Sequence, residues 1–169
     1  VADDGKLTAG KPAQAIEDRI AQVTQEAYDN GDYIFVAMDR HDEGDTFHPE
    51  TKLFPPHNIA GTDGRELYGK LAGVYDAIKD DNRVFWMDKR HYSAFSGTDL
   101  DIRLRERRVT TVVLTGVLTD ICVLHTAIDA YNLGYDIEVV ESATASLTPE
   151  AHDFAIGHLK NVLGATIVE

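Results

Sequence analysis

The fold of this chain is decided by the stretch Val109-Thr110-Thr111-Val112-Val113-Leu114-Thr115-Gly116-Val117-Leu118-Thr119-Asp120-Ile121-Cys122. Its first part, residues 109–114, is rich in β-branched side chains and predicts a buried strand. Apolar residues then recur at helical spacing from Ile121 to Tyr131, and Gly134 ends that pattern. A buried strand that leads directly into a helix is the repeating unit of a parallel sheet covered by helices.

The same alternation of strand and helix runs along the rest of the chain. Strands are predicted over residues 33–38, 83–87, 137–140 and 165–168, and helices over 12–30, 67–78, 99–107 and 149–163. The pattern predicts a three-layer α/β/α sandwich with a central, mostly parallel sheet. Neither a linker nor an internal repeat divides the chain, so residues 1–169 are predicted to form a single domain.

Composition excludes several classes of protein. The net charge of −13 argues against a nucleic-acid partner, because phosphate binding requires clustered Lys and Arg, and the one basic cluster lies over residues 103–108. No apolar run has membrane length and no secretory signal is present, which predicts no membrane partner. A single cysteine rules out an internal disulfide and favours a reducing, cytoplasmic location.

That single cysteine, Cys122, stands where the strand turns into the helix. A helix N-terminus carries partial positive charge and unpaired N–H groups, which favour a thiolate and can hold a developing oxyanion. The position therefore suggests acyl-transfer chemistry. The alternative is a small buried apolar residue, which is the usual role of a lone cysteine.

Other polar residues follow the predicted strands. Asp39 and His41 come after strand 33–38, Lys89 after strand 83–87, and Cys122 after strand 109–114. Because functional side chains gather at the carboxyl ends of parallel strands, we expect these residues to share one cleft. Lys89, if partly desolvated there, could stabilise a thiolate or an oxyanion, whereas an exposed lysine in a charged turn is the alternative.

The long irregular segment 39–63 carries candidate metal ligands. Its two imidazoles and two carboxylates make a reasonable site for Zn, Fe or Mn: Asp39, His41, Glu50 and His57. His48 is a competing ligand, and a polar surface loop is the alternative. Three aromatic residues near the same strand ends could line a pocket for a flat ring, although Trp86 could equally belong to the core: Phe54, Trp86 and Tyr92.

With these residues assembled, the chain resembles the isochorismatase-like cysteine hydrolases, and more closely their nicotinamidase/pyrazinamidase branch. The most specific part of the resemblance is the nucleophile segment 116–123. The segment Asp88-Lys89-Arg90-His91-Tyr92-Ser93-Ala94-Phe95 comes next, followed by Asp39-x-His41 with His48-Pro49-Glu50 and His57. The resemblance covers nearly the whole chain.

The resemblance implies an amidohydrolase that converts nicotinamide, and also pyrazinamide, to the acid and ammonia through a thioester on Cys122. It implies that Lys89 is the second member of an Asp-Lys-Cys triad. The N–H groups of Leu118 and Cys122 would form the oxyanion hole, beside a cis peptide bond before Leu118. Asp39, His41, His57 and Glu50 would hold a divalent metal, zinc first and iron or manganese as alternatives. Such an enzyme serves NAD salvage.

One part of the family pattern is not in this sequence. The triad aspartate of the family lies at the end of the first strand, and that segment should come immediately before Val1. Asp3 and Asp4 do not match it. The resemblance therefore predicts that the natural protein carries a further, central strand with the aspartate ahead of Val1.

Several alternatives stay open at this level. The chain could be another amidase or an isochorismatase-type hydrolase of the same superfamily, and an isochorismatase would not need the metal cluster. A thiol redox protein would lack an intramolecular resolving cysteine. A non-catalytic metal-binding or scaffolding protein is the third alternative. The resemblance also implies a homo-oligomer.

Overall fold

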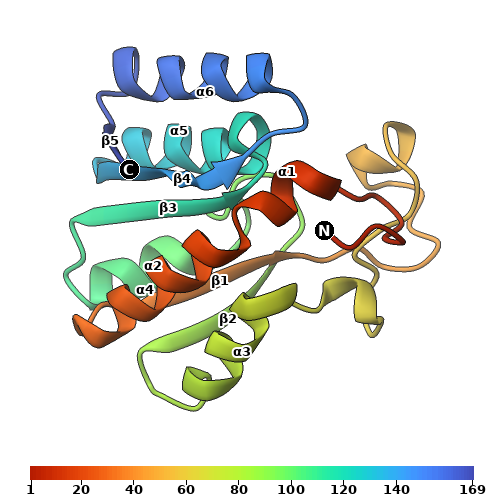
Figure 1. Ribbon diagram of the computed structural model, residues 1–169, viewed down its shortest axis with the longest axis horizontal. Coiled ribbons are helices and arrows are strands. Elements are labelled where there is room, and N and C mark those ends of the chain that lie inside the picture. Colours follow the sequence, from red (N-terminus) through yellow and green to blue (C-terminus); the bar gives the residue numbers. More distant parts are fainter.

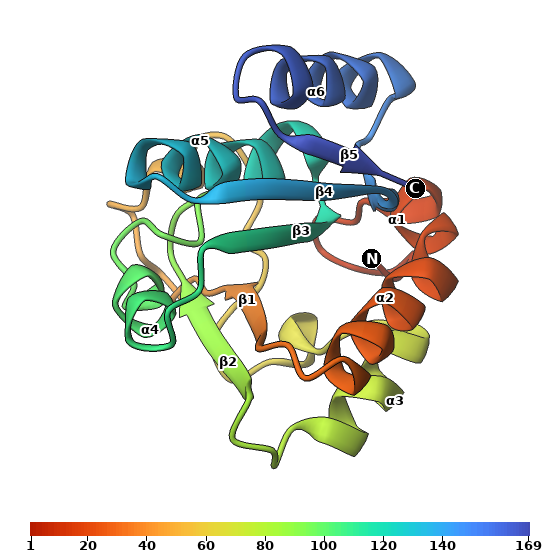
Figure 2. The same cartoon turned by 90° about the vertical axis from the view of Figure 1, so that its left-hand side faces the viewer.

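The computed structural model describes residues 1–169 and places five strands in two parallel sheets. Strand β1 (Ile34–Asp39) pairs with β2 (Val84–Lys89). Strand β3 (Thr111–Val117) pairs with β4 (Asp136–Ala145), and β5 (Thr166–Val168) pairs with the other edge of β4. The two sheets approach each other at β1 and β3 (Figures 1 and 2), but no hydrogen-bonded pairing joins these strands.

Helices cover both sides of the strands. Helices α1 (Gly10–Ala15), α2 (Glu17–Asp29) and α3 (Gly69–Ile78) lie on one side, and α4 (Leu100–Glu106) and α5 (Leu124–Leu133) lie on the other (Figure 2). Helix α6 (Pro149–Asn161) packs beside α5 and leads to β5. Short helical turns complete the chain: η1 (Pro49–Lys52), η2 (Asp63–Arg65) and η3 (Thr119–Val123). This arrangement confirms the predicted α/β fold with parallel strands between helical layers.

The main core lies between the strands and the layer formed by α4, α5 and α6. Ala127 of α5, Val139 of β4 and Leu159 of α6 have no exposed surface. In the first half of β4 the apolar residues Ile137, Val139 and Val140 are buried, whereas Asp136 is exposed. This buried layer supports the carboxyl ends of the strands, where the candidate site lies.

Three predicted elements differ in detail from the structure. The helix predicted over residues 12–30 is two helices, because the backbone at Ile16 leaves the helical region with φ −90° and ψ 2°. Strand β4 continues beyond Val140, since a register shift between Leu114 and Gly116 lets β3 and β4 pair again further along. Asp99 precedes α4 as predicted, but its carboxylate accepts from Arg103 Nε (2.7 Å) rather than from a backbone N–H.

None of the helices is both long enough and apolar enough to cross a bilayer. The predicted single domain stays a prediction.

We predict that Leu159→Ala lowers the free energy of unfolding by about 2–5 kcal/mol, because it removes a large side chain from a closed core and leaves a cavity. Leu159 has 0% exposed surface, whereas Val162, three residues further on, is 59% exposed. Val162→Ala is therefore the matched control and should change stability by less than about 0.5 kcal/mol. Urea denaturation followed by circular dichroism measures both, and equal effects of the two changes would contradict the packing described.

Candidate active site

The ends of β1 and β2 bring a carboxylate and an ammonium group together. Asp39 and Lys89 are partners in the parallel register of these strands. Lys89 is 4% exposed, and its Nζ forms an ion pair with the Asp39 carboxylate and donates to the carbonyl of His91 (3.1 Å). The same Nζ lies 3.5 Å from Cys122 Sγ. The structure therefore brings Asp39, Lys89 and Cys122 together, as predicted from their positions after the strands.

The thiol reaches Lys89 because β3 ends in an unusual turn. Gly116 has a φ of 105°, a backbone conformation that side chains rarely adopt, and the peptide bond between Val117 and Leu118 is cis, as the resemblance implied. The next residues form η3, a single π-helical turn, and α5 begins at Leu124. Cys122 thus lies within a π-turn ahead of the α-helix, a form of helix start often found at functional sites.

The charge state of this thiol differs from the expectation. Burial raises the pKa of Cys122 to about 11, although the Lys89 ammonium acts in the opposite direction. Burial alone would lower the pKa of Lys89, but the interactions with Cys122 and Asp39 outweigh it and raise that pKa. The raised pKa of Cys122 therefore favours a neutral thiol beside a charged lysine, rather than the thiolate that a helix N-terminus alone would favour. Nucleophilic attack requires that a base take the proton.

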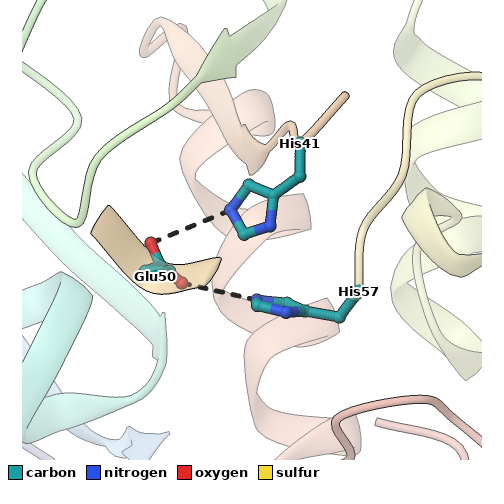
Figure 3. A group of neighbouring side chains, drawn as sticks. All are labelled: His41, Glu50 and His57. Carbon is teal, nitrogen blue, oxygen red and sulfur yellow. Dashed lines mark ion pairs between the residues drawn. The ribbon is translucent and has the colours of Figure 1, made fainter. Parts of the chain in front are cut away.

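A second group of side chains lies beside this pair. His41 follows β1, Glu50 lies in η1, and His57 lies in the loop after it, and the three converge from different parts of the segment (Figure 3). Glu50 Oε1 is 3.8 Å from His41 Nε2, and Glu50 Oε2 is 3.5 Å from His57 Nε2. One ligand atom from each residue falls within 4.8 Å of the others, and all three residues are buried.

Burial and the neighbouring groups shift the pKa values of these three residues in different directions. His57 Nδ1 lies 2.9 Å from the Pro55 carbonyl, which can only accept, so Nδ1 carries a proton and a neutral His57 presents the bare Nε2 to Glu50. Burial lowers the pKa of His41, and its Nε2 is a buried nitrogen with no hydrogen-bond partner. A hydrogen bond from His57 and neighbouring positive charge outweigh burial and lower the pKa of Glu50. The hydrogen bond to Glu50 in turn raises the pKa of His57, so in the absence of a metal these two residues share a proton. Two imidazole nitrogens and a carboxylate are ligands that suit a divalent cation, whose binding would displace that proton.

Two other ligand candidates take different partners. The carboxylate of Asp39 pairs with Lys89 and is not among the ligand atoms that converge at His41, Glu50 and His57. His48 is buried, with Nδ1 accepting from the Glu50 N–H (3.3 Å) and Nε2 donating to the Arg90 carbonyl. Both ring nitrogens of His48 are occupied, so His48 orients the segment that carries Glu50. The assignment of Asp39 as a fourth metal ligand stays a prediction.

Arginines that the sequence analysis did not single out fasten this segment to the end of β2. Arg90 donates to the carboxylates of Asp42 (2.5 Å) and Asp45 (2.6 Å), near the start of the segment. Arg65, in η2 near its end, donates to the Asp39 carbonyl (2.9 Å) and to the carboxylate of Asp88. One indication of a role for Arg90 was present in the sequence, because it is next to Lys89. The partners of Arg90 could not be predicted, because they lie far away in the sequence.

The three predicted aromatic residues lie in different surroundings. The Phe54 ring is 6.2 Å from the His57 ring and borders a cavity of about 260 Å³ that His41, Glu50 and His57 also line. Tyr92 lies 5.3 Å from the His125 ring, in a second cavity of about 340 Å³ that shares Glu50 as a wall. Trp86 packs against Tyr75 of α3 and donates to Asp88, so the structure does not bring it close to the proposed metal ligands His41, Glu50 and His57. Their roles in substrate binding stay predictions.

Comparison with known proteins gives the same family. The isochorismatase domain matches residues 5–168. An uncharacterised isochorismatase family protein PncA of Bacillus subtilis (strain 168) is 53% identical over 169 residues, covering 100% of this chain and 92% of the relative. The chain belongs to the isochorismatase family.

Solved structures of that family match closely. The crystal structure of pyrazinamidase/nicotinamidase from Streptococcus mutans UA159 superposes with a TM-score of 0.98 at 80% identity, covering 99% of this chain and 92% of that chain. A pyrazinamidase of Pyrococcus horikoshii in complex with zinc matches with a TM-score of 0.80 at 26% identity, covering 93% of this chain and 86% of that chain.

We predict that iodoacetamide modifies Cys122 of the folded protein with a pH–rate profile that rises toward about 11 rather than toward the ordinary cysteine range. Because a raised pKa reduces the thiolate fraction at every lower pH, the folded protein should react roughly 100-fold more slowly at pH 7.5 than the same chain in urea. Cys122 is the only cysteine, so Cys122→Ser serves as the blank. An inflection below pH 8 in the folded protein would contradict the neutral resting thiol.

Proposed function

We propose that this protein is a metal-dependent cysteine amidohydrolase that converts nicotinamide to nicotinic acid and ammonia, and acts likewise on pyrazinamide. The observation that carries the proposal is the contact of one buried ammonium group, that of Lys89, with Cys122 Sγ at 3.5 Å and with the Asp39 carboxylate. Proteins described as pyrazinamidase/nicotinamidase that share this fold at 80% and 53% identity support the choice of substrate.

In the proposed reaction Cys122 loses its proton and its sulfur attacks the amide carbon of the substrate. A general base takes that proton, because burial raises the pKa of the thiol to about 11. The N–H groups of Leu118 and Cys122 hold the oxyanion, and the Lys89 ammonium stabilises the negative charge across the short distance to Sγ. The amide nitrogen takes the proton and leaves as ammonia, which produces a thioester on Cys122.

Water then completes the reaction. The same base removes a proton from water, the hydroxide oxygen attacks the thioester carbon, and the carbon–sulfur bond breaks to give nicotinic acid and the thiol. Lys89 is suited to both steps, because its neighbours keep it charged although it is buried. One water is consumed and one ammonia released in each cycle.

His41, Glu50 and His57 would hold the metal, with Asp39 as the proposed fourth ligand. We propose zinc first, with iron or manganese as alternatives, because imidazole and carboxylate ligands suit all three. When bound, the ion supplies a positive centre beside the pocket that can accept the ring nitrogen of the substrate. Phe54, Tyr92 and Trp86 are the aromatic residues proposed to contact the ring. A role in NAD salvage, a cytoplasmic location and a homo-oligomer also stay predictions.

We predict that Cys122→Ala lowers ammonia release from nicotinamide by at least about 1,000-fold, because it removes the nucleophile. The measurement is a coupled ammonia assay on the full natural chain, with nicotinamide and pyrazinamide as substrates. Val162→Ala, on the exposed side of the chain after α6, is the control and should match the wild-type rate. Ammonia release by Cys122→Ala at the wild-type rate would remove the thioester from consideration.

A further prediction concerns the metal. The chelated protein should take up one zinc ion per chain on titration, and His41→Ala, Glu50→Gln and His57→Ala should each weaken that binding by at least about 100-fold, since each removes a converging ligand. His158→Ala, which changes a histidine of α6 outside the group, is the matched control. Asp39→Asn tests the fourth ligand in the same assay.

Isothermal titration and metal analysis give the result without reference to activity. Zinc affinity that is unchanged in His57→Ala would show that the metal binds elsewhere. Release of ammonia should fall with the metal content when the wild-type protein is treated with a chelator.

A further inference from the structure

The turn that carries Cys122 is held from the outside by two pairs of side chains. The Thr119 hydroxyl is hydrogen-bonded to Nδ1 of His152, a residue of α6, at 2.9 Å. The Asp120 carboxylate accepts from the hydroxyl of Ser146 at 2.6 Å, and the same hydroxyl accepts from the Asp120 backbone N–H at 3.3 Å. We call these two pairs the η3 clamp.

The η3 clamp lies mostly in the protein interior. Thr119 has no exposed surface and Ser146 is 4% exposed. His152 Nε2, at the other end of the imidazole ring, lies 3.8 Å from the carboxylate of Glu141. Hydrogen bonds in such surroundings are costly to leave unmade, so they hold one geometry more firmly than exposed pairs do.

The position of the clamp in the chain gives it a direct influence on the reacting atoms. Leu118 precedes Thr119, and Cys122 follows Asp120 by two residues, so the two residues proposed for the oxyanion hole lie on either side of the clamped pair. The Leu118 carbonyl accepts from the N–H groups of Ile121 and Val123, both at 3.2 Å. A rotation of Thr119 and Asp120 would therefore carry Leu118 and Cys122 with it.

Two of the five residues of η3 take hydrogen-bonding partners that lie 26 and 33 positions away in the chain. π-helical turns are rare and occur mostly as single turns, frequently at functional sites. The partners of the η3 clamp come from the segment after β4 and from α6, which do not contact the metal group. The clamp thus supports the nucleophile independently of the metal.

We propose that four residues are positioning residues: Thr119, Asp120, Ser146 and His152. They hold Cys122 Sγ beside Lys89, so that the sulfur and the N–H groups of Leu118 and Cys122 face the substrate carbonyl. None of the four touches the reacting atoms. Their effect on turnover rests on the proposed amidase function, but their effect on the exposure of the thiol does not.

The test compares Ser146→Ala and Thr119→Val, each of which removes one pair of the clamp while nearly keeping the shape of the side chain. We expect kcat for nicotinamide to fall about tenfold or more with KM changed less than about threefold, because misplacement of the nucleophile affects the reaction step and not the metal-side contacts. We expect iodoacetamide to modify Cys122 several-fold faster than in the wild type, because a loosened turn exposes the thiol.

Thr119→Ser keeps the hydroxyl group and should restore both values to within about threefold of the wild type. Ser142→Ala is the matched control, since Ser142 lies in the same strand as the clamp's neighbour Glu141 but its hydroxyl bonds to the half-buried Arg19 (3.2 Å) and not to the clamp. Circular dichroism at the assay temperature verifies that each variant is folded, and Asp120→Asn, which keeps the shape and one oxygen acceptor, replaces any variant that is not.

Cys122 modification at the wild-type rate, or slower, in folded Ser146→Ala and Thr119→Val would overturn the proposal. Faster modification together with no ammonia release even by the wild-type protein would retain the clamp and reject the substrate assignment. The two failures are therefore distinguishable.

Discussion

The arrangement of the site depends on one buried cation, the ammonium group of Lys89. Lys89 is the last residue of β2 and the register partner of Asp39 in β1. Its ammonium group also contacts Cys122, which follows β3 of the other sheet. A buried ammonium group requires negative or polar partners, and loss of one partner leaves a costly unpaired charge. The contacts of Lys89 thus join the two sheets at the site, although no hydrogen-bonded strand pairing joins them.

The proposed metal ligands and the thiol both lie near Lys89, but different sets of contacts hold them in place. The segment with His41, Glu50 and His57 is fastened by Arg90, which follows Lys89, and by the His48 ring. The turn with Cys122 is fastened by buried hydroxyl groups on the opposite side. The first set of contacts is largely exposed and ionic, so it is weakened by salt, whereas the second is buried and much less affected.

Much of the fold and part of the site followed from local patterns. Strand periodicity located β1, β2 and β3 to within a few residues, and the rule that side chains gather at the ends of parallel strands predicted that Asp39, Lys89 and Cys122 would meet. Residue chemistry placed His41, Glu50 and His57 among the candidate ligands, but segment 39–63 holds other carboxylates and another imidazole, and only the structure shows that these three side chains converge.

The sequence by itself determined the order of strands and helices, the position of the lone cysteine and the residue types of the proposed metal site, because each depends on short-range pattern and side-chain chemistry. Only the tertiary structure decided which partner each polar group takes. Asp39 forms an ion pair with Lys89, both ring nitrogens of His48 form hydrogen bonds with backbone groups, and Trp86 packs on α3. It also decided that burial leaves Cys122 a neutral thiol. These outcomes depend on the distances between residues far apart in the chain and on how completely water is excluded from them. Neither can be derived from the spacing of residues along the sequence.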